Sequence, residues 1–213
     1  MEEKPARVRV PQQKRSEETR QRILEAGRKL LCEEGYHATS SKKIAKEAGV
    51  SVGSFYSYFR DKKDLFLAIN HDMTELIRDV ISQDLDKLLF EGHDGRAMVR
   101  TIINKAVERH EAAPELHKQF MILMFEDDEV AAVMQKEKAQ IVALLVAIFE
   151  THADILRVTD YQAAATVVVD AVEAVIHTVK FFDSPVEEER LINELGDMIH
   201  FFLIKEHDEC CGE

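Results

Sequence analysis

Hydrophobic residues recur with helical spacing along most of the chain. In the first such segment the apolar positions follow the i, i+3, i+4, i+7, i+8 pattern of one buried helix face, as in Ile23, Ala26, Gly27, Leu30 and Leu31. Ser16 is expected to cap this helix at its start. Gly35 is expected to end it, because glycine readily adopts the left-handed conformation that follows a last helical turn.

Two short helical segments follow, at about 41–48 and 52–59. Ile44, Ala45 and Ala48 form the apolar side of the first segment, while Phe55 and Phe59 lie on one side of the second. Between them Gly49 permits a turn, Val50 fills it, and Ser51 offers a cap for the next helix. This pattern predicts two short helices that pack closely across a tight turn.

Longer helices are expected over the rest of the chain, at about 63–90, 96–112, 115–125, 129–153, 160–182 and 186–205. The polar stretch 91–95, Pro114, the segment 154–160 and Pro185 separate them. The β-branched run 167–169 lies inside a helical pattern, and no other segment alternates in the manner of a strand. The sequence therefore predicts an all-α protein of about nine helices.

Charge is distributed unevenly along the chain. Residues 1–63 hold 15 Lys and Arg against 9 Asp and Glu, a net charge of +6, whereas residues 64–213 hold 13 against 31, a net charge of −18. A basic head on an acidic body predicts that the head meets a polyanion. No apolar run reaches the roughly 18 residues that span a bilayer, and the polar N-terminus does not resemble a signal peptide. We expect a cytoplasmic protein that does not enter membranes.

The two short helices have the proportions of a helix-turn-helix. The second helix of such a unit lies in the major groove and presents its N-terminal residues to the base edges. In this chain those residues are Ser51, Val52, Gly53 and Ser54, all small enough to let the backbone approach a duplex. Val52 has no hydrogen-bonding group, so it is expected to favour a thymine methyl if it reaches a base.

The segment Gly35–Phe66, GYHATSSKKIAKEAGVSVGSFYSYFRDKKDLF, resembles the DNA-binding region of the TetR family of transcriptional regulators. The match is dense and ordered. It includes Gly35-Tyr36, Thr39-Ser40, Ile44-Ala45, Ala48-Gly49-Val50-Ser51, Gly53-Ser54, Phe55-Tyr56, Tyr58-Phe59, Lys62 and Leu65. The resemblance covers about the first 70 residues. Beyond them only the length and the helical pattern fit the family.

The resemblance implies a role in DNA binding for nine residues: Ser41, Lys42, Ser51, Val52, Gly53, Ser54, Tyr56, Tyr58 and Lys62. Lys42, Tyr56, Tyr58 and Lys62 would contact phosphates, and Ser51 to Ser54 would read bases. Ser41 departs from the apolar residue common in the family, so it would cap its helix or reach DNA. The alternatives are a half-buried Tyr56 and an ordinary solvated lysine face on the first short helix.

The resemblance also implies four regions: a flexible basic arm (1–16), a DNA-binding domain (17–63), an effector-binding and dimerisation domain (64–207) and a tail (208–213). Arg7 and Arg9 of the arm would enter a minor groove, or the arm has no role. The last two helices would form a homodimer interface through their small and apolar faces, such as Ala171 and Leu195. The alternative is that these faces are buried within one chain.

An effector pocket would lie among the middle helices and bind a small, largely apolar molecule. Its candidate lining residues are Ile102, Val107, Phe120, Met121, Met124, Phe125, Leu145, Phe149 and Val172. His110, His117, His152 and His177 are candidates for polar contacts. Nothing in their spacing pairs them, so no metal ligands and no cofactor are predicted. Cys32, Cys210 and Cys211 predict neither a disulfide framework nor a zinc site.

The expected function is that of a DNA-binding regulator. We expect a repressor that binds a palindromic operator as a homodimer and is released from it by a small molecule. A DNA-binding activator or a regulator without a ligand remains an alternative, as does a protein-interaction module that uses the helix-turn-helix only as a scaffold. No nucleophile elbow, phosphate loop or dinucleotide fingerprint is present, so the chain is not expected to be an enzyme and no catalytic residue is predicted.

Overall fold

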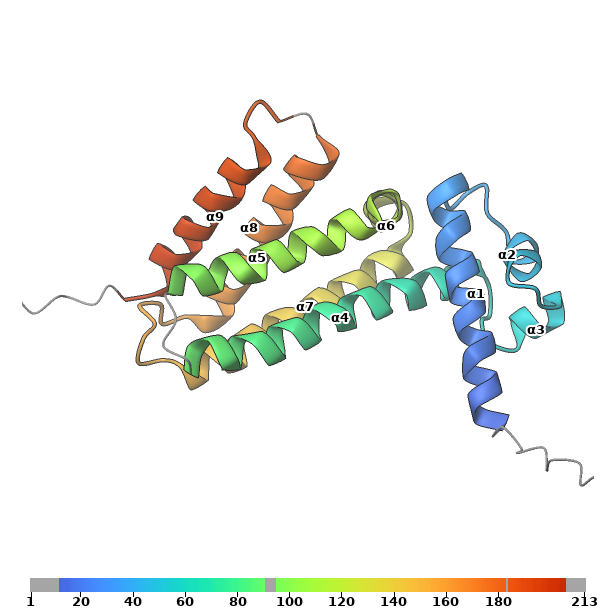
Figure 1. Cartoon of the computed structure of the whole chain (residues 1–213), viewed down its shortest axis with the longest axis horizontal. Helices are drawn as coiled ribbons and strands as arrows, with labels where there is room; N and C mark the ends of the chain where they lie inside the picture. The colour runs from blue at the N-terminus through green and yellow to red at the C-terminus, as the bar shows by residue number, and fades with distance from the viewer. Residues whose placement is uncertain (1–11, 91–94, 183, 206–213) are drawn as a thin grey trace, which may run out of the picture. The chain divides into compact units, whose positions relative to one another are not determined.

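The computed structural model of the chain describes residues 12–90, 95–182 and 184–205 (Figure 1). These residues form nine α-helices that divide into two compact units, Met1–Ile69 and Asn70–Glu213. The boundary falls six residues beyond the predicted end of the DNA-binding domain at residue 63, because α4 (Lys62–Phe90) contributes its first two turns to the first unit. Within the described residues, no helix combines the length and apolarity needed to cross a membrane.

The first unit is a bundle of α1 (Gln12–Glu34), α2 (Ser41–Glu47), α3 (Val52–Tyr56) and the start of α4. Its core contains the predicted apolar positions, which are almost fully buried: Ile23, Leu31, Ile44, Phe55, Leu65 and Phe66. Gly27 lies where α1 meets α4, and a Cβ added there would come within 2.5 Å of a methyl of Leu65. The glycine therefore permits the close approach of these two helices.

The start of α1 differs from the prediction. We expected a flexible arm to residue 16 and a cap at Ser16, but the helix begins at Gln12 and includes Lys14, Arg15 and Ser16. Proline is favoured in the first turn of helices, where its missing N–H costs nothing. A proline in the sequence therefore does not exclude that a helix starts directly after it. The remaining arm residues, Arg7 and Arg9 among them, lie outside the described residues.

The second unit contains the rest of α4 with α5 (Gly95–Ala112), α6 (Pro114–Glu126), α7 (Asp128–Thr151), α8 (Tyr161–Phe181) and α9 (Glu188–Leu203). The helix α5 packs against α8 and α9, and α7 packs against α6 and α8. Side chains such as Ile103, Val142, Ala165 and Ile176 form one continuous core between them. The expected helix boundaries hold to within about two residues, and the start of the predicted break at 91–95 lies outside the described residues.

Helix ends in this unit follow local capping chemistry. Asp127 and Asp160 cap α7 and α8 by accepting hydrogen bonds from backbone N–H groups of their first turns. Pro114 stands at the start of α6, where a proline is tolerated. The chain after α9 returns to the loop before α8 through an isolated antiparallel bridge between Leu156 and Ile204. The absence of strands expected from the sequence agrees with the part of the chain that the structure describes.

Candidate nucleic-acid interface

The turn between α2 and α3 has the geometry that its sequence predicts. Gly49 has a φ of +66°, the left-handed region that glycine tolerates best. The N–H of Val50 donates to the carbonyl of Ala45 across 3.0 Å, and Ala45 is fully buried. The hydroxyl of Ser51 accepts a hydrogen bond of 2.9 Å from the N–H of Ser54, which caps α3. These contacts hold the two short helices in one relative orientation.

The N-terminus of α2 is capped differently from the expectation. Ser40, not Ser41, is the N-cap, and its hydroxyl accepts from the N–H of Lys43 at 3.3 Å. Ser41 is the first residue of the helix and is half-buried. Ser40 already serves the backbone, so the side chain of Ser41 is not needed as a cap. Its predicted contact with DNA remains a prediction.

The first turn of α3 presents small residues to solvent. Ser51 and Gly53 are exposed, and 40% of Val52 is accessible. A Cβ added to Gly53 would meet nothing nearer than the Ser51 hydroxyl at 3.8 Å. The packing of this chain therefore does not require glycine at position 53. A glycine with open space before it leaves the backbone accessible to a partner from outside the chain.

The two tyrosines after this turn have different surroundings. Tyr56 is 54% exposed, so it is not the half-buried core residue that we kept as an alternative. The hydroxyl of Tyr58 accepts a hydrogen bond of 3.2 Å from Ser16, which lies 42 residues earlier on α1. The same hydroxyl can still donate its own proton. Both hydroxyls are thus placed at the surface near α3.

The lysines of α2 also differ from one another. Lys42 is exposed in the first turn, whereas Lys43 donates to the carboxylate of Glu34 at 2.5 Å and to the carbonyl of Ala38 at 3.0 Å. Glu47 accepts a hydrogen bond of 2.6 Å from Lys29 of α1, which raises the pKa of Lys29. Lys43 therefore helps to hold α2 against α1. Lys42, the second residue of α2, is exposed.

Lys62 has a role that the sequence did not indicate. Its ammonium donates to the carbonyl of Tyr36 at 2.7 Å and to that of Thr39 at 3.0 Å, and it lies 4.2 Å from the centre of the Tyr36 ring. Burial lowers the pKa of Lys62 below its ordinary value. The side chain therefore ties the start of α4 to the loop between α1 and α2.

The next residues complete the start of α4. The N–H of Asp64 donates to the carboxylate of Asp61 at 2.8 Å. The carboxylate of Asp64 accepts from the N–H of Arg60 at 3.0 Å and from its guanidinium at 3.1 Å. Burial acts to raise the pKa of Asp64, but these hydrogen bonds and the charge of Arg60 outweigh it and lower the pKa.

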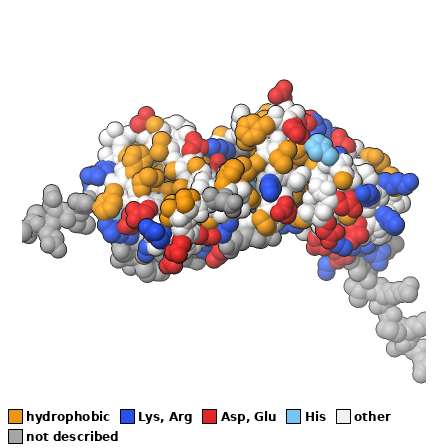
Figure 2. All heavy atoms as spheres, turned by 90° about the horizontal axis from the view of Figure 1, so that it is seen from above, with side chains coloured by type: hydrophobic (Ala, Val, Ile, Leu, Met, Phe, Trp, Pro, Cys, Tyr) orange, Lys and Arg blue, Asp and Glu red, His pale blue; other side chains and the backbone are white. Residues whose placement is uncertain are grey.

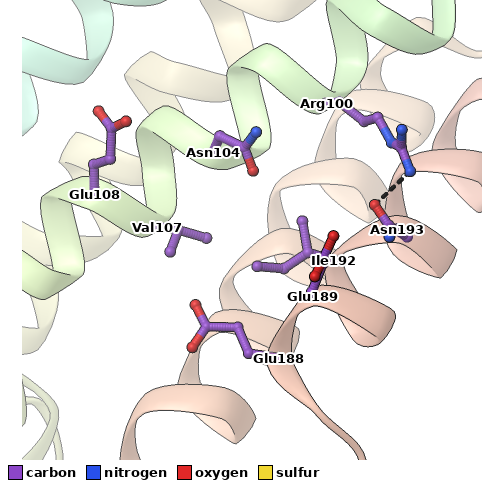
Figure 3. A pocket seen from close by; sticks show the side chains of 8 residues that line it. All are labelled: Arg100, Asn104, Val107, Glu108, Glu188, Glu189, Ile192 and Asn193. Carbon is purple, nitrogen blue, oxygen red and sulfur yellow. Dashed lines mark hydrogen bonds between the residues drawn. The ribbon is translucent and has the colours of Figure 1, made fainter.

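The nine predicted effector-pocket residues do not share one surface. Phe120, Leu145 and Phe149 are buried, Ile102 and Val172 pack against the core, and Met121 and Met124 are half-buried. Phe125 is 82% exposed, so it lines no enclosed cavity of this chain. Only Val107 of the nine lines the cleft that lies between α5 and α9 (Figure 3).

That cleft has a volume of about 640 Å³ and is more polar than we expected (Figure 3). Val107 and Ile192 supply its apolar wall. Its other lining residues are polar or charged: Arg100, Asn104, Glu108, Glu188, Glu189 and Asn193. The guanidinium of Arg100 donates to the side-chain oxygen of Asn193, and Glu188, one of the three carboxylates, is paired with Lys180.

Two sets of side chains carry chemistry that the sequence pattern did not group. The carboxylate of Glu137 on α7 is buried and accepts hydrogen bonds from Asn70 and Thr74 of α4. His110, His117 and His177 lie together, whereas we expected them to be unpaired. No spacing signal could have shown this, because the three histidines belong to α5, α6 and α8.

Each of the two units contains a region that matches a model of a known protein family. Residues 23–69 match the family model described as bacterial regulatory proteins of the tetR family. Residues 96–203 match a second model, described as a tetracyclin repressor-like C-terminal domain. The second match alone covers about half of the chain, and together the two leave only the ends of the chain and residues 70–95 unmatched.

Individual relatives agree with these matches. A fatty acid metabolism regulator protein of Bacillus subtilis (strain 168) is 30% identical over 118 residues, which are 55% of this chain and 52% of that protein. An HTH-type transcriptional regulator of Staphylococcus aureus (strain bovine RF122 / ET3-1) is 46% identical over 61 residues, 28% of this chain and 33% of the relative. The chain thus spans about a third to a half of the length of these curated relatives.

Solved structures show the same fold over most of the chain. Salmonella enterica GusR superposes with a TM-score of 0.72 at 24% identity and covers 93% of this chain and 99% of its own. A TetR-family regulator from Mesorhizobium loti superposes with a TM-score of 0.73 at 17% identity, over 90% of this chain and 99% of its own.

Proposed function

Because this chain belongs to the TetR family and carries its helix-turn-helix domain, we propose that it represses transcription from a palindromic operator. In this proposal it binds the operator as a homodimer and leaves it when a small molecule binds the second unit. The observation that carries the proposal is the exposed first turn of α3. It contains Gly53, although the packing of the chain leaves room for a larger side chain there.

The first unit supports binding to the major groove. The N-terminus of α3 presents Ser51, Val52 and Gly53 to solvent, which are the positions that a helix-turn-helix uses to reach base edges. The cap and the turn hold these residues before any DNA arrives, so little ordering is needed on binding. The net charge of +6 over residues 1–63 favours association with a polyanion.

Phosphate contacts would come from exposed donors on either side of α3. The exposure of Lys42 and Tyr56 and the surface position of the Tyr58 hydroxyl support this role for them. Lys62 was predicted to join them. Since two carbonyls already accept from its ammonium, we propose that it contributes mainly by fixing the loop before α2 and keeps at most one N–H for phosphate.

The second unit offers a surface for dimerisation. Some of the predicted interface residues, including Ala165, Ile176 and Leu195, are buried within the chain itself. Four large apolar side chains of α8 and α9 are exposed, and Met198 and Phe202 among them belong to the predicted interface; the other two are Val167 and Phe201. Figure 2 shows hydrophobic side chains gathered where these helices lie. Two copies could cover this surface, and two reading helices would lengthen the DNA sequence that is recognised.

The effector would bind in the cleft between α5 and α9. Its three carboxylates and two amides favour a ligand that carries positive charge or several hydrogen-bond donors, in place of the largely apolar molecule that we expected. Glu188 accepts a hydrogen bond of 2.5 Å from Lys180 of α8. A ligand that binds Glu188 would compete with this hydrogen bond and so weaken a contact between α8 and α9. The ligand is thereby coupled to one of the proposed dimer helices.

Release from DNA would follow from a shift between conformations of the dimer. The helix α4 runs without a break from the first unit into the second, and its residues Asn70 and Thr74 are held by Glu137 of α7. A ligand that binds one arrangement of the second unit better changes the population of DNA-competent dimers. A difference of about 1–3 kcal/mol in that binding changes operator affinity roughly 5–150-fold.

Salt-dependent binding to a random-sequence duplex tests whether the first unit is the DNA-binding surface. The logarithm of affinity should fall linearly with the logarithm of salt concentration. Lys42→Gln should reduce both the affinity and the slope, whereas Lys136→Gln on α7, which removes the same charge from an exposed site in the acidic unit, should change neither. Equal effects of the two variants, or no binding by the folded protein at low salt, would contradict the proposal.

A further inference from the structure

Three histidines from different helices meet inside the second unit. His110 lies near the end of α5, His117 in the first turns of α6, and His177 in the last part of α8. One ring nitrogen from each lies within 4.8 Å of the other two. His110 is buried, at 3% exposure, while His117 and His177 are half-buried. Side chains from three helices thus converge through their imidazoles.

The distance between two of these rings matches a metal site. Nε2 of His117 and Nε2 of His177 are 3.3 Å apart. Two nitrogens bound to a tetrahedral zinc ion at about 2.0–2.1 Å are separated by roughly 3.3–3.4 Å. The pair therefore already has the spacing of two ligands. A nitrogen of His110 lies within 4.8 Å, so a modest movement of this ring toward the pair would complete the spacing of three ligands.

The protonation of His110 is set by its backbone. Its Nδ1 lies 2.7 Å from the carbonyl oxygen of Ala106 one turn earlier on α5. A carbonyl only accepts hydrogen bonds, so Nδ1 carries the proton and Nε2 carries the lone pair. Nε2 is buried. Metal-binding histidines usually donate their other N–H to a carbonyl or carboxylate in this way, which fixes the tautomer and orients the ring.

An aromatic ring covers one side of the cluster. Phe181, one turn after His177, stacks on His117 with an interplanar angle of 13° and packs against His177 at 5.6 Å between ring centres. Such an apolar wall limits the access of water to ligands on that side. The half-buried edges of His117 and His177 leave access from the other side. An ion could therefore enter, and a water could occupy a fourth position.

We propose that His110, His117 and His177 together bind one divalent transition-metal ion of the zinc type. Three neutral imidazoles suit zinc, copper, nickel and cobalt, whereas magnesium and calcium require oxygen ligands. Bound metal would connect α5, α6 and α8 and stabilise their arrangement, because the ligands are brought together only in the folded chain. The competing interpretation is a hydrogen bond between two neutral imidazoles, His117 and His177, with no ion.

Cobalt(II) is a suitable probe, because its visible absorption reports the number and geometry of its ligands. The titration uses the full chain with Cys210→Ser and Cys211→Ser, since adjacent thiols could bind metal on their own. We expect one equivalent to bind with a tetrahedral or five-coordinate spectrum, and Zn²⁺ to displace it. Zn²⁺ should also raise the melting temperature of this chain.

His177→Gln is the diagnostic variant, because His177 is half-buried and its loss is compatible with folding. It should weaken Co²⁺ binding by more than the roughly 10–100-fold that loss of an outer-shell partner costs, and should abolish the Zn²⁺ effect on melting. His200→Gln, an equally half-buried histidine on α9, is the matched control and should change neither.

A six-coordinate, weak spectrum in the Cys-replaced chain, or equal binding by His177→Gln and His200→Gln, would overturn the metal site and leave the imidazole hydrogen bond. Circular dichroism without metal confirms that each variant is folded before the titration. Neither readout involves DNA. Failure of the metal site is therefore distinguishable from failure of the proposed operator binding.

Discussion

Gly53 and Gly49 are only four residues apart, yet they are glycines for different reasons. Gly49 has a positive φ, so the backbone itself requires a residue that tolerates the left-handed region. Gly53 lies in a helix with open space where a Cβ would project. A helix interior normally prefers alanine to glycine by up to about 1 kcal/mol. Gly53 is the second residue of α3, where this cost is smaller, and no contact within the described residues requires a glycine there; we propose that close approach of DNA does.

Alanine at each position separates the two explanations. Gly53→Ala should leave the melting temperature unchanged or raise it slightly, while reducing DNA affinity because the new methyl projects toward the duplex. Gly49→Ala should lower stability by about 1 kcal/mol through backbone strain, although nothing lies within 4 Å of its added Cβ. Thermal melts of both variants measure the change in stability, and DNA titrations measure the change in affinity. Unchanged DNA affinity in Gly53→Ala would remove the main support for α3 as the reading helix.

Lys62 was predicted from the sequence to contact phosphate, and its hydrogen bonds to two carbonyls add a structural role. Lys62→Met keeps the aliphatic stem but leaves the carbonyls of Tyr36 and Thr39 without their donor. We expect the free energy of unfolding to fall by about 1–3 kcal/mol. Urea denaturation measures the change, with Lys42→Met at an exposed position as the control. If the two variants had equal stability, Lys62 would not hold the loop.

The helices show where local sequence is sufficient to predict structure. The starts of α3 and α7 are specified by short-range capping groups, Ser51 and Asp127, and both starts were predicted to within one residue, whereas α3 ends at Tyr56, three residues before the expected end. The start of α1 was missed by four residues, because Ser16 was expected to cap a helix that begins at Gln12. The roles of Lys62 and Glu137 and the grouping of the histidines depend on contacts between helices distant in sequence. Hydrophobic periodicity predicts which face of a helix is buried but not which polar groups meet there.

The start of α4 has a pH-dependent component of stability. The pKa of Asp64 is lowered in the folded chain, because hydrogen bonds from Arg60 outweigh the effect of burial. A lowered folded pKa means that the carboxylate stabilises the fold above the ordinary pKa of about 3.9, and that this contribution is lost as the pH falls through the folded value.

Asp64→Asn removes this component while keeping the shape of the side chain. At pH 7 the variant should be less stable by about 1 kcal/mol or less, since the carboxylate is partly exposed and close to the positive end of α4. The difference between the two proteins should shrink below about pH 4. Urea denaturation at a series of pH values provides the comparison. A difference that persists at pH 2 would show that charge is not the cause.

At the scale of the whole molecule, the distribution of charge and of exposed apolar side chains differs between the two units. The basic charge lies in the unit with the helix-turn-helix, while the second unit is acidic and presents apolar side chains on α8 and α9. An acidic surface would be repelled by DNA phosphates, which leaves the first unit as the part that approaches the duplex. The exposed apolar residues of the last two helices are then available for a second copy of the chain.

Charge substitution tests this arrangement. The double variant Met198→Glu and Phe202→Glu should convert a dimer to a monomer, because two carboxylates per chain would be buried in the interface without partners. Sedimentation velocity gives the mass. Phe125→Glu on α6 is the matched control, because it also places an acid at an exposed aromatic position and should leave the dimer intact. A dimer that survives the double variant would place the interface elsewhere.

Selection of bound duplexes from a random DNA pool, followed by sequencing, tests the central claim most directly. The account predicts an inverted repeat whose half-sites lie about one helical turn or a multiple of it apart, since each copy contributes one α3. Tyr56→Ala should lose the enrichment, and Tyr161→Phe on α8 should retain it. Recovery of no preferred sequence by a folded, dimeric protein would contradict the claim that this chain is an operator-binding regulator.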